Sequence, residues 1–190
     1  MCELEWLIHI SLDGFVAGKL GELDGFDASE ENLGFVCDLT EKADTAIIGR
    51  KSFQLLESFR PTAKDRQGAT KNEIRYSKWY NSARVFVASN SMESSDRVTA
   101  INGGIVDEIR RIKHNGRKNL LLFGNPSVAR GLTDADLIDN FWIFVNPVIF
   151  GDGIPLFNGV VAKKRLKLID TRKFINGEVA CKYVLRSDGN

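Results

Sequence analysis

The stretch Asn119-Leu-Leu-Leu-Phe-Gly-Asn-Pro-Ser-Val-Ala-Arg-Gly131 decides how the rest of the chain is interpreted. Its four consecutive apolar residues, 120–123, predict a β-strand that is buried on both faces. Gly124 ends this strand. Pro126 follows where the first residue of a helix is expected, because no internal hydrogen bond needs its missing N–H there. The stretch therefore predicts a strand, a tight turn and a helix whose first amides point back at the strand end.

The start of such a helix suits a phosphate group. Its first amides have no partner within the helix, and the aligned peptide dipoles place a partial positive charge there. The plainer alternative is an ordinary strand-to-helix junction without a ligand. On this stretch alone, the plainer interpretation is favoured.

The composition is that of a folded domain with no preference for nucleic acid. The chain has 190 residues, 43% of them hydrophobic and 27% charged, which predicts a single domain over residues 1–190 with a substantial core. Its 26 Lys and Arg residues nearly balance its 25 Asp and Glu residues, for a net charge of +1. We therefore expect no nucleic-acid partner, since such proteins usually carry a basic excess.

Cysteine usage and the start of the chain indicate the compartment. The three cysteines, Cys2, Cys37 and Cys181, are odd in number and widely spaced, which favours free thiols in a reducing environment. No apolar run reaches the length of a membrane span, and the first residues lack the order of a signal peptide. We expect a soluble, cytoplasmic protein with no membrane partner.

Short apolar runs alternate with helical patterns along most of the chain. Apolar runs predict strands at 4–11, 44–49, 84–89, 97–101, 120–123 and 141–145. A helix is expected after Ser29, which can cap it, another over 72–81 with Ile74 and Trp79 facing inward, and another over 103–115. Asn176-Gly177 then predicts a hairpin between 165–174 and 178–186. The sequence thus predicts an α/β fold closed by an antiparallel hairpin.

Two further regions leave functional alternatives open. Arg50 and Lys51 follow the strand ending at Gly49, where cations oppose the dipole of the next helix. A bound anion would remove this conflict, but both side chains could equally reach solvent. The loop after the first strand contains four closely spaced glycines, from Gly14 to Gly25, and is either a mobile lid or a connection.

Several kinds of chemistry lack their motifs. The only histidines are His9 and His114, and there is no Gly-Xaa-Ser-Xaa-Gly sequence, no metal-binding motif, no P-loop and no complete Gly-Xaa-Gly-Xaa-Xaa-Gly. We therefore expect no metal site. Polar or cationic residues follow three predicted strand ends, at Gly49, Ser89 and Gly124. In an open α/β sheet the crevice at these ends is the default ligand site, and a phosphate-bearing redox dinucleotide fits it.

The order of five motifs resembles a known superfamily. They are Ser11-Leu-Asp-Gly-Phe-Val-Ala17, Ile48-Gly-Arg-Lys-Ser-Phe53, Leu122-Phe-Gly124, Pro147-Val-Ile-Phe-Gly-Asp-Gly-Ile-Pro-Leu-Phe157 and Tyr183. Over nearly its whole length the chain resembles the dihydrofolate reductase-like superfamily. It is most similar to the reductase domain of riboflavin-biosynthesis deaminase–reductases and to the stand-alone relatives of that domain.

The resemblance implies a three-layer αβα fold with a mixed, mostly parallel sheet, NADPH bound across the strand ends, and a homodimer. It implies cofactor contacts at three places. Phosphates would bind Gly49, Arg50, Lys51 and Ser52, the pyrophosphate would bind Gly124, Asn125, Pro126 and Ser127, and the 2′-phosphate would lie near Ser89 and Asn90. Relatives often carry Arg where Asn90 stands, which leaves NADH as an alternative.

The resemblance also places two candidate catalytic carboxylates. The loop 12–18 would cover the nicotinamide, and the substrate would lie between this loop and the helix after Ser29, near Asp13 and Asp27. Dihydrofolate reductases keep a buried, proton-donating carboxylate near the region of Asp27. A donor of this kind needs a raised pKa. Asp13 and Asp27 could equally be turn residues.

The expected function is an NAD(P)H-dependent reductase that transfers hydride to a small heterocyclic or pyrimidine-type substrate. The alternative is a non-catalytic, dimerising nucleotide-binding relative that kept the fold without turnover. The apolar segment 147–157 must pack on something, and a second subunit is one candidate.

Overall fold

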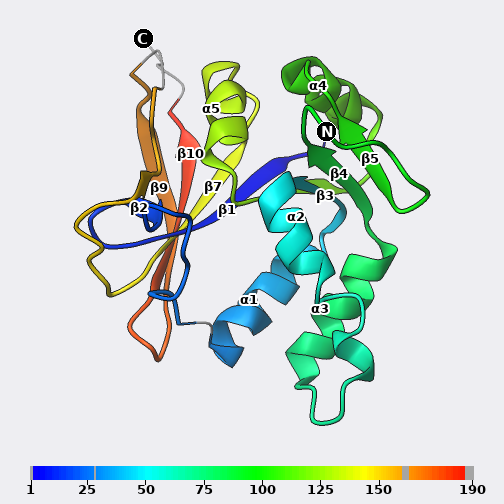
Figure 1. Cartoon of the computed structure of the whole chain (residues 1–190). Coiled ribbons are helices and arrows are strands. Elements are labelled where there is room, and N and C mark those ends of the chain that lie inside the picture. The colour runs from blue at the N-terminus through cyan, green and yellow to red at the C-terminus, as the bar shows by residue number, and fades with distance from the viewer. Residues whose placement is uncertain (1, 28, 160–162, 187–190) are drawn as a thin grey trace.

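An eight-stranded sheet forms the centre of the protein (Figure 1). The computed structural model describes residues 2–27, 29–159 and 163–186. The strands lie in the order β5-β4-β3-β6-β1-β7-β10-β9. Their bounds are β1 Leu4–Ile10, β3 Ala43–Gly49, β4 Arg84–Ala88, β5 Val98–Ile101, β6 Asn119–Phe123, β7 Asn140–Val145, β9 Leu166–Lys173 and β10 Val179–Leu185.

The sheet is mixed but mostly parallel, as expected. Strands β5, β4, β3, β6, β1 and β7 are parallel, and β10 runs antiparallel to both β7 and β9. The strand from the opening stretch, β6, lies between β1 and β3, and Leu120, Leu121 and Leu122 are fully buried. Because side chains alternate between the two faces of a strand, complete burial requires cover on both sides.

Helices cover both faces and produce the expected three-layer αβα arrangement (Figure 1). Helices α4 (Ile105–Asn115) and α5 (Pro126–Asp134) pack on one face, where β1 contributes Trp6. Helices α1 (Glu30–Thr40), α2 (Arg50–Glu57) and α3 (Lys71–Ser82) pack on the other, where β1 contributes Leu7. Two separate apolar cores result, one for each face.

Local capping signals fix where the helices begin. Ser29 accepts a hydrogen bond from the amide of Asn32 at the start of α1, and Pro126 is the first residue of α5, both as predicted. Thr70 and Glu73 form a capping box at the start of α3.

The prediction for the buried face of α3 was right for Trp79 and wrong for Ile74. Trp79 is half-buried and packs against the core, where its indole N–H donates to the carbonyl of Ala43. Ile74 is half-buried and does not belong to this core. The fully inward positions belong to Tyr76, Ser77 and Tyr80, and Arg60 lies over the ring of Tyr76.

Three further elements lie outside the main sheet and the helices named above. The sequence did not predict the pair formed by β2 (Phe15–Ala17) and β8 (Ile154–Pro155), or the short 3₁₀ helix η1 (Ala63–Asp65). Within the described part of the chain, no helix has the length and apolarity needed to cross a membrane.

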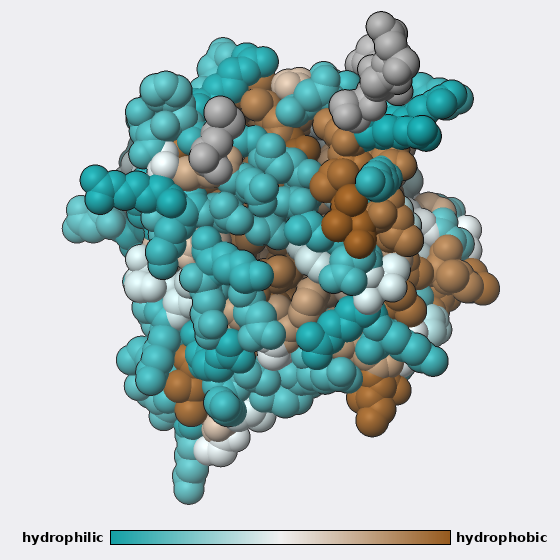
Figure 2. Space-filling model, turned by 180° about the vertical axis from the view of Figure 1, so that it is seen from behind, coloured by the Kyte–Doolittle hydropathy of each residue, from teal (hydrophilic) through white to brown (hydrophobic). Residues whose placement is uncertain are grey.

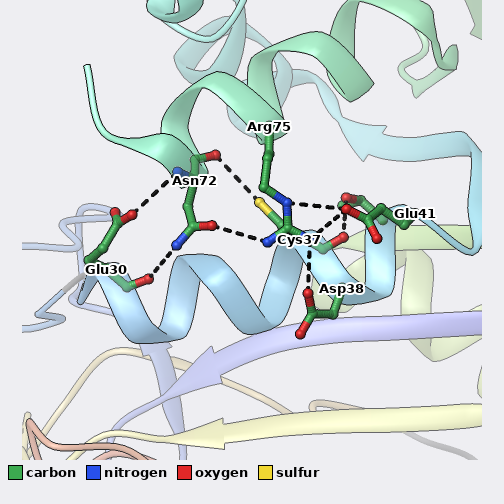
Figure 3. Close-up of polar contacts among 7 residues, drawn as sticks. Glu30, Cys37, Asp38, Glu41, Asn72 and Arg75 are labelled. Carbon is green, nitrogen blue, oxygen red and sulfur yellow. Dashed lines mark hydrogen bonds and ion pairs between the residues drawn. The ribbon is translucent and has the colours of Figure 1, made fainter. Parts of the chain in front are cut away.

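A polar cluster fastens α1 to α3 (Figure 3). Asn72 on α3 donates from its side chain to the carbonyl of Glu30 (3.2 Å), and its side-chain oxygen accepts from Arg75 (3.1 Å). Arg75 also contacts Asp38 (2.9 Å) and Glu41 (2.5 Å) on α1. The helices approach closely here because Gly34 has no side chain. This cluster fixes the position of α1, which borders the candidate site.

We predict that Gly34→Ala does not stabilise the protein, although alanine usually stabilises a helix by about 1 kcal/mol over glycine. The new Cβ would lie 2.9 Å from Nδ2 of Asn72. Displacing that side chain would break two hydrogen bonds worth about 1 kcal/mol each, so the unfolding free energy should fall by about 1 kcal/mol. Urea denaturation measures this change. In an Asn72→Ala background the same substitution should be stabilising, and equal effects in both backgrounds would contradict the proposed contact.

Candidate functional site

The carboxyl-terminal ends of parallel strands β1, β3, β4 and β6 meet at one edge of the sheet. Because β6 is inserted between β1 and β3, the helices that follow β3 and β6, α2 and α5, pack on opposite faces of the sheet. In an open α/β sheet, a ligand crevice is expected at such a point. The residues that the sequence analysis assigned to cofactor binding all follow these strand ends. Two of the turns are in direct contact.

The turn after β3 touches the turn after β6. A Cβ atom built on Gly49 would lie 2.3 Å from Nδ2 of Asn125, and one built on Gly124 would lie 3.6 Å from Oγ of Ser52. The residue types at these positions therefore bring the starts of α2 and α5 side by side. A side chain at position 49 would force the two helix starts apart.

Hydrogen bonds to β1 and within the turn itself hold the turn after β6 in place. The indole N–H of Trp6 donates to the carbonyl of Gly124 (2.8 Å), and the amide of Gly124 donates to the carbonyl of Leu7 (3.0 Å). Asn125 adopts the left-handed conformation (φ 52°), which asparagine tolerates better than most residues. Its side-chain oxygen accepts from the amide of Val128 (3.3 Å) and from the hydroxyl of Ser127 (2.7 Å).

The two helix starts differ in the donors that they offer an anion. In α5, Pro126 has no N–H, and the amide of Val128 is already bound by Asn125. No side chain caps the start of α2 at Gly49. The first turn of α2, from Arg50 to Ser52, therefore offers more open amides than α5 does.

Arg50 links the turns after β3 and β6 to the turn after β4. We call these three turns together the cradle. Its guanidinium donates to the hydroxyl of Ser91 (2.5 Å), and the amide of Ser91 donates to the hydroxyl of Ser89 (3.3 Å). Asn90 is exposed between these serines. Lys51 is also exposed, and it makes no hydrogen bond or ion pair with the residues described. A cluster of open amides with two cations at its rim results.

Asp13 fastens two loops together on the other side of the crevice. Its carboxylate accepts from the amides of Phe150 (3.1 Å) and Gly151 (2.8 Å). The hydroxyl of Ser11, followed by these two amides, holds the pKa of the Asp13 carboxyl below its usual range. The carboxylate is therefore charged at neutral pH, which suits a structural contact better than proton donation.

The apolar segment 147–157 packs at least partly on its own chain. The rings of Phe26 and Phe150 lie 5.1 Å apart, the rings of Trp6 and Phe157 lie 5.9 Å apart, and Leu156 is buried. The amide of Leu12 donates to the carbonyl of Val148 (2.7 Å). The glycine-rich loop after β1 is thus tied to this segment.

Asp27 lies on the rim of the same side, with its side chain exposed. Its carbonyl accepts from the side chain of Asn176 in the hairpin turn (3.0 Å). This hydrogen bond involves the backbone of Asp27 and not its carboxylate, whose role as a proton donor stays a prediction.

A buried carboxylate in this region was not predicted from the sequence. Glu178, at the start of β10, is fully buried, and one of its oxygens accepts from the side chain of Asn32 on α1 (2.8 Å). The other oxygen lies 2.8 Å from Nδ1 of His9, near the end of β1. The only sequence signal was a histidine within an apolar strand, two residues after Leu7 and therefore on the same face. Nothing in the sequence indicated that Glu178 reaches it.

The chain matches the RibD C-terminal domain over residues 4–180, and it belongs to this family. The family is a reductase-type enzyme domain. Among individual proteins, the chain is 33% identical to the uncharacterized protein YyaP of Bacillus subtilis (strain 168) over 177 residues, which cover 93% of this chain and 91% of YyaP.

Solved structures agree with this assignment. A protein from Shewanella sp. PV-4 with a provisional riboflavin-biosynthesis name is 25% identical, with a TM-score of 0.73 over 98% of this chain and all (100%) of that one. Dihydrofolate reductase from Enterococcus faecalis, in complex with NADP(H), has a TM-score of 0.66 and 15% identity over 97% of each chain. The latter likeness establishes the dihydrofolate reductase-like fold alone.

We predict that Gly49→Ala destabilises the protein through the contact between the two turns. The backbone at Gly49 (φ −75°) accepts alanine without strain, so the effect isolates the contact with Asn125. The expected loss of unfolding free energy is roughly 1–3 kcal/mol. Denaturant unfolding of Gly49→Ala, Asn125→Gly and the double variant checks it. The double variant should regain most of the loss, and strictly additive effects would show that the turns are independent.

Proposed function

We propose that the protein is an NADPH-dependent reductase that transfers hydride to a small, flat heterocyclic substrate of the pyrimidine type. The observation that supports this most is the joining of three turns, after β3, β4 and β6, into one cradle through the contacts of Gly49, Arg50 and Gly124. An extended ligand with phosphates at its centre matches such a cradle. The family assignment supports the same activity.

The residues of the cradle fit the phosphates of NADPH. The open amides from Arg50 to Ser52 would hold one phosphate, with the ammonium group of Lys51 beside it. The amides of Asn125 and Ser127 would hold the other, since Pro126 has none. When bound, the reduced nicotinamide supplies the hydride.

We assign the preference for NADPH to the turn after β4. The hydroxyl of Ser89, the side chain of Asn90 and the guanidinium of Arg50 lie at the outer end of the cradle. A 2′-phosphate placed there would gain a charge-assisted bond to Arg50, which NADH lacks.

The substrate would lie between the loop after β1 and the start of α1. Aromatic rings border this region: Phe26 lies against Phe150 (5.1 Å) and near His9 (6.3 Å), and His9 stacks on Phe144 (4.7 Å). Aromatic walls favour a flat conjugated ring. Asp13 contributes by holding the loop over this space. The free cysteines Cys2, Cys37 and Cys181 and the use of NADPH are consistent with a cytoplasmic location.

Calorimetry with NADPH and NADH, followed by NADPH oxidation with a substrate panel, tests this function. The panel contains dihydrofolate and 5-amino-6-(5-phosphoribosylamino)uracil. Binding with turnover of a panel member supports a reductase. Binding without turnover supports the alternative, a non-catalytic nucleotide-binding relative. Absence of binding to either cofactor would overturn both.

We predict that Lys51→Ala weakens NADPH binding about 5- to 10-fold at low salt, because a charge-assisted contact to phosphate is worth roughly 1.5–3 kcal/mol and is partly screened at this exposed position. The loss should shrink as salt is raised. Calorimetry at two ionic strengths measures it. Lys78→Ala, at an exposed lysine of α3, is the matched control. Equal affinities for both variants would remove Lys51 from the cradle.

We further propose that the protein forms a homodimer through β9, the edge strand of the sheet. Leu168 and Ile169 on β9 are each 49% exposed, and β9 is the last strand of the sheet. Figure 2 shows apolar side chains gathered towards the side where β9 and β10 lie, next to a more polar surface. An exposed apolar edge of this kind favours association with another copy.

We predict that Leu168→Glu shifts the protein to a monomer, because a carboxylate placed in an apolar interface loses its hydration. Sedimentation velocity at several protein concentrations measures the change. Leu20→Glu is the control, because Leu20 is 89% exposed in the loop between β2 and α1 and does not belong to β9. A monomeric wild type, or a Leu168→Glu variant that remains dimeric, would contradict this interface.

A further inference from the structure

A buried carboxylate with an incomplete set of hydrogen bonds lies beside the proposed substrate space. Glu178 is 0% exposed, and one oxygen is satisfied by Asn32. The other oxygen, Oε1, has no hydrogen-bond donor among the described groups, and it lies 2.8 Å from Nδ1 of His9, a contact that becomes an ion pair when the imidazole is protonated. Buried polar atoms are normally satisfied, so this exception requires an explanation.

A second buried glutamate in the same sheet shows what a purely structural carboxylate looks like here. Glu5 is 3% exposed, and its two oxygens accept from the side chains of Asn119 (3.0 Å) and Trp142 (2.9 Å). Both donors are neutral and neither titrates near neutral pH. Glu178 differs because its second partner is a histidine, which changes charge in the physiological range.

His9 occupies a position from which it can reach a ligand. Its side chain is 39% exposed, while one face of the ring stacks on Phe144 at 4.7 Å. Nδ1 faces Glu178, and Nε2 has no hydrogen-bond partner among the described residues. A carboxylate at Nδ1 favours the proton there and orients the ring, which leaves Nε2 as the atom that exchanges protons with a ligand.

The position of His9 along β1 relates it to the cofactor cradle. The carbonyl of Leu7 accepts from the amide of Gly124, which begins the turn after β6. His9 lies two residues further along the same strand. Its Cα atom is therefore roughly 7 Å from that of Leu7, at the usual rise per residue. The phosphate cradle and the imidazole are therefore neighbours at the same edge of the sheet.

We propose that His9 is the proton donor of the reaction and that Glu178 is its positioning residue, acting on a substrate with a polarised C=N or C=O bond. This inference rests on the proposed reductase function. A ring nitrogen of His9, and not the carboxylate of Asp13 or Asp27, would then donate the proton to the substrate.

The proposed reduction needs one hydride, from the cofactor, and one proton, from His9. When bound, the reduced nicotinamide would supply a hydride that forms the new C–H bond at the carbon of the C=N or C=O group, and it would be oxidised in return. The π-electron pair of that bond moves to the nitrogen or oxygen, which takes the proton from Nε2 of His9. The buried carboxylate of Glu178 stabilises the imidazolium before transfer, and the exposed ring regains a proton from water.

The other carboxylates on the elements around His9 contact other partners or are exposed to solvent. On α1, Glu31 lies 3.7 Å from Arg172 of β9. Asp13 is bound to the amides of Phe150 and Gly151, and Asp27 is exposed. Of the described carboxylates, Glu178 is the one within ion-pair distance of His9.

NMR of the histidine rings tests the coupling without any turnover. His9 and His114 are the two histidines of the chain, so a His114→Gln variant assigns the signals. In Glu178→Gln, the ring signals of His9 should shift at a fixed pH, because the carboxylate facing Nδ1 has been removed. Glu5→Gln should leave them unchanged. Unchanged His9 ring signals in Glu178→Gln would overturn the positioning role.

Turnover measurements with the panel compound that the wild type reduces fastest test the donor role. His9→Gln should lower kcat by roughly 10²–10³-fold, with the dissociation constant for NADPH within about twofold of wild type. In Glu178→Gln the alkaline fall of kcat should move to lower pH, because the carboxylate facing Nδ1 is lost, whereas Glu5→Gln should keep the wild-type profile.

The outcomes separate this inference from the proposed function. Wild-type turnover that His9→Gln retains would overturn the donor assignment and leave the reductase standing. NADPH binding with no reduction of any panel compound would overturn both the reductase and the donor, even with the His9–Glu178 coupling intact. Loss of kcat in His9→Gln together with the shifted profile in Glu178→Gln would support the inference.

Discussion

The insertion of β6 between β1 and β3 is the constraint on which the rest of the site depends. It places the Gly124-Asn125 turn against Gly49, where a single methyl group would not fit. The indole N–H of Trp6 fixes the position of this turn above the sheet by donating a hydrogen bond to the carbonyl of Gly124. A fully buried aromatic residue in the core of one face thus determines the geometry of a surface cradle. Core packing and ligand binding are therefore difficult to separate in this protein.

The two halves of the crevice are built by different means. The phosphate side consists of turns between parallel strands and helices, whose positions follow from the sheet itself. The substrate side consists of loop 12–27, segment 147–157 and the closing hairpin, which are joined by individual contacts such as those of Asp13 and Glu178. Such an arrangement lets one fold keep a common cofactor cradle while the substrate side varies, because loops tolerate change better than the sheet.

Local signals predicted many of the elements. The strand 120–123, Pro126 at the start of α5, the Ser29 cap and the Asn176-Gly177 turn each act over a few residues, and all four have the predicted structure. The contact of Gly49 with Asn125 depends on strand order, which no local signal encodes.

The unpredicted part of the site consists of contacts between residues distant in sequence. Asp13 reaches Phe150, and Glu178 reaches both His9 and Asn32. No periodicity or spacing encodes these pairs, because each depends on how a loop or hairpin lies over the finished sheet. A glutamate beside a hairpin turn also has the pattern of an ordinary surface residue, so burial at this position could not be read from the sequence.

The place of β10 in the chain affects when the site can be completed. Ribosomal synthesis releases β1 and α1 early, whereas β10, which carries Glu178 to them, emerges after every other strand of the sheet. Until then the imidazole of His9 and the side-chain amide of Asn32 lack the carboxylate that they face, and a one-residue slip of the hairpin would turn this carboxylate to the opposite face of the sheet. A nascent chain that has already formed the turns after β3, β4 and β6 therefore still lacks the contacts of Glu178, which arise only with the final hairpin.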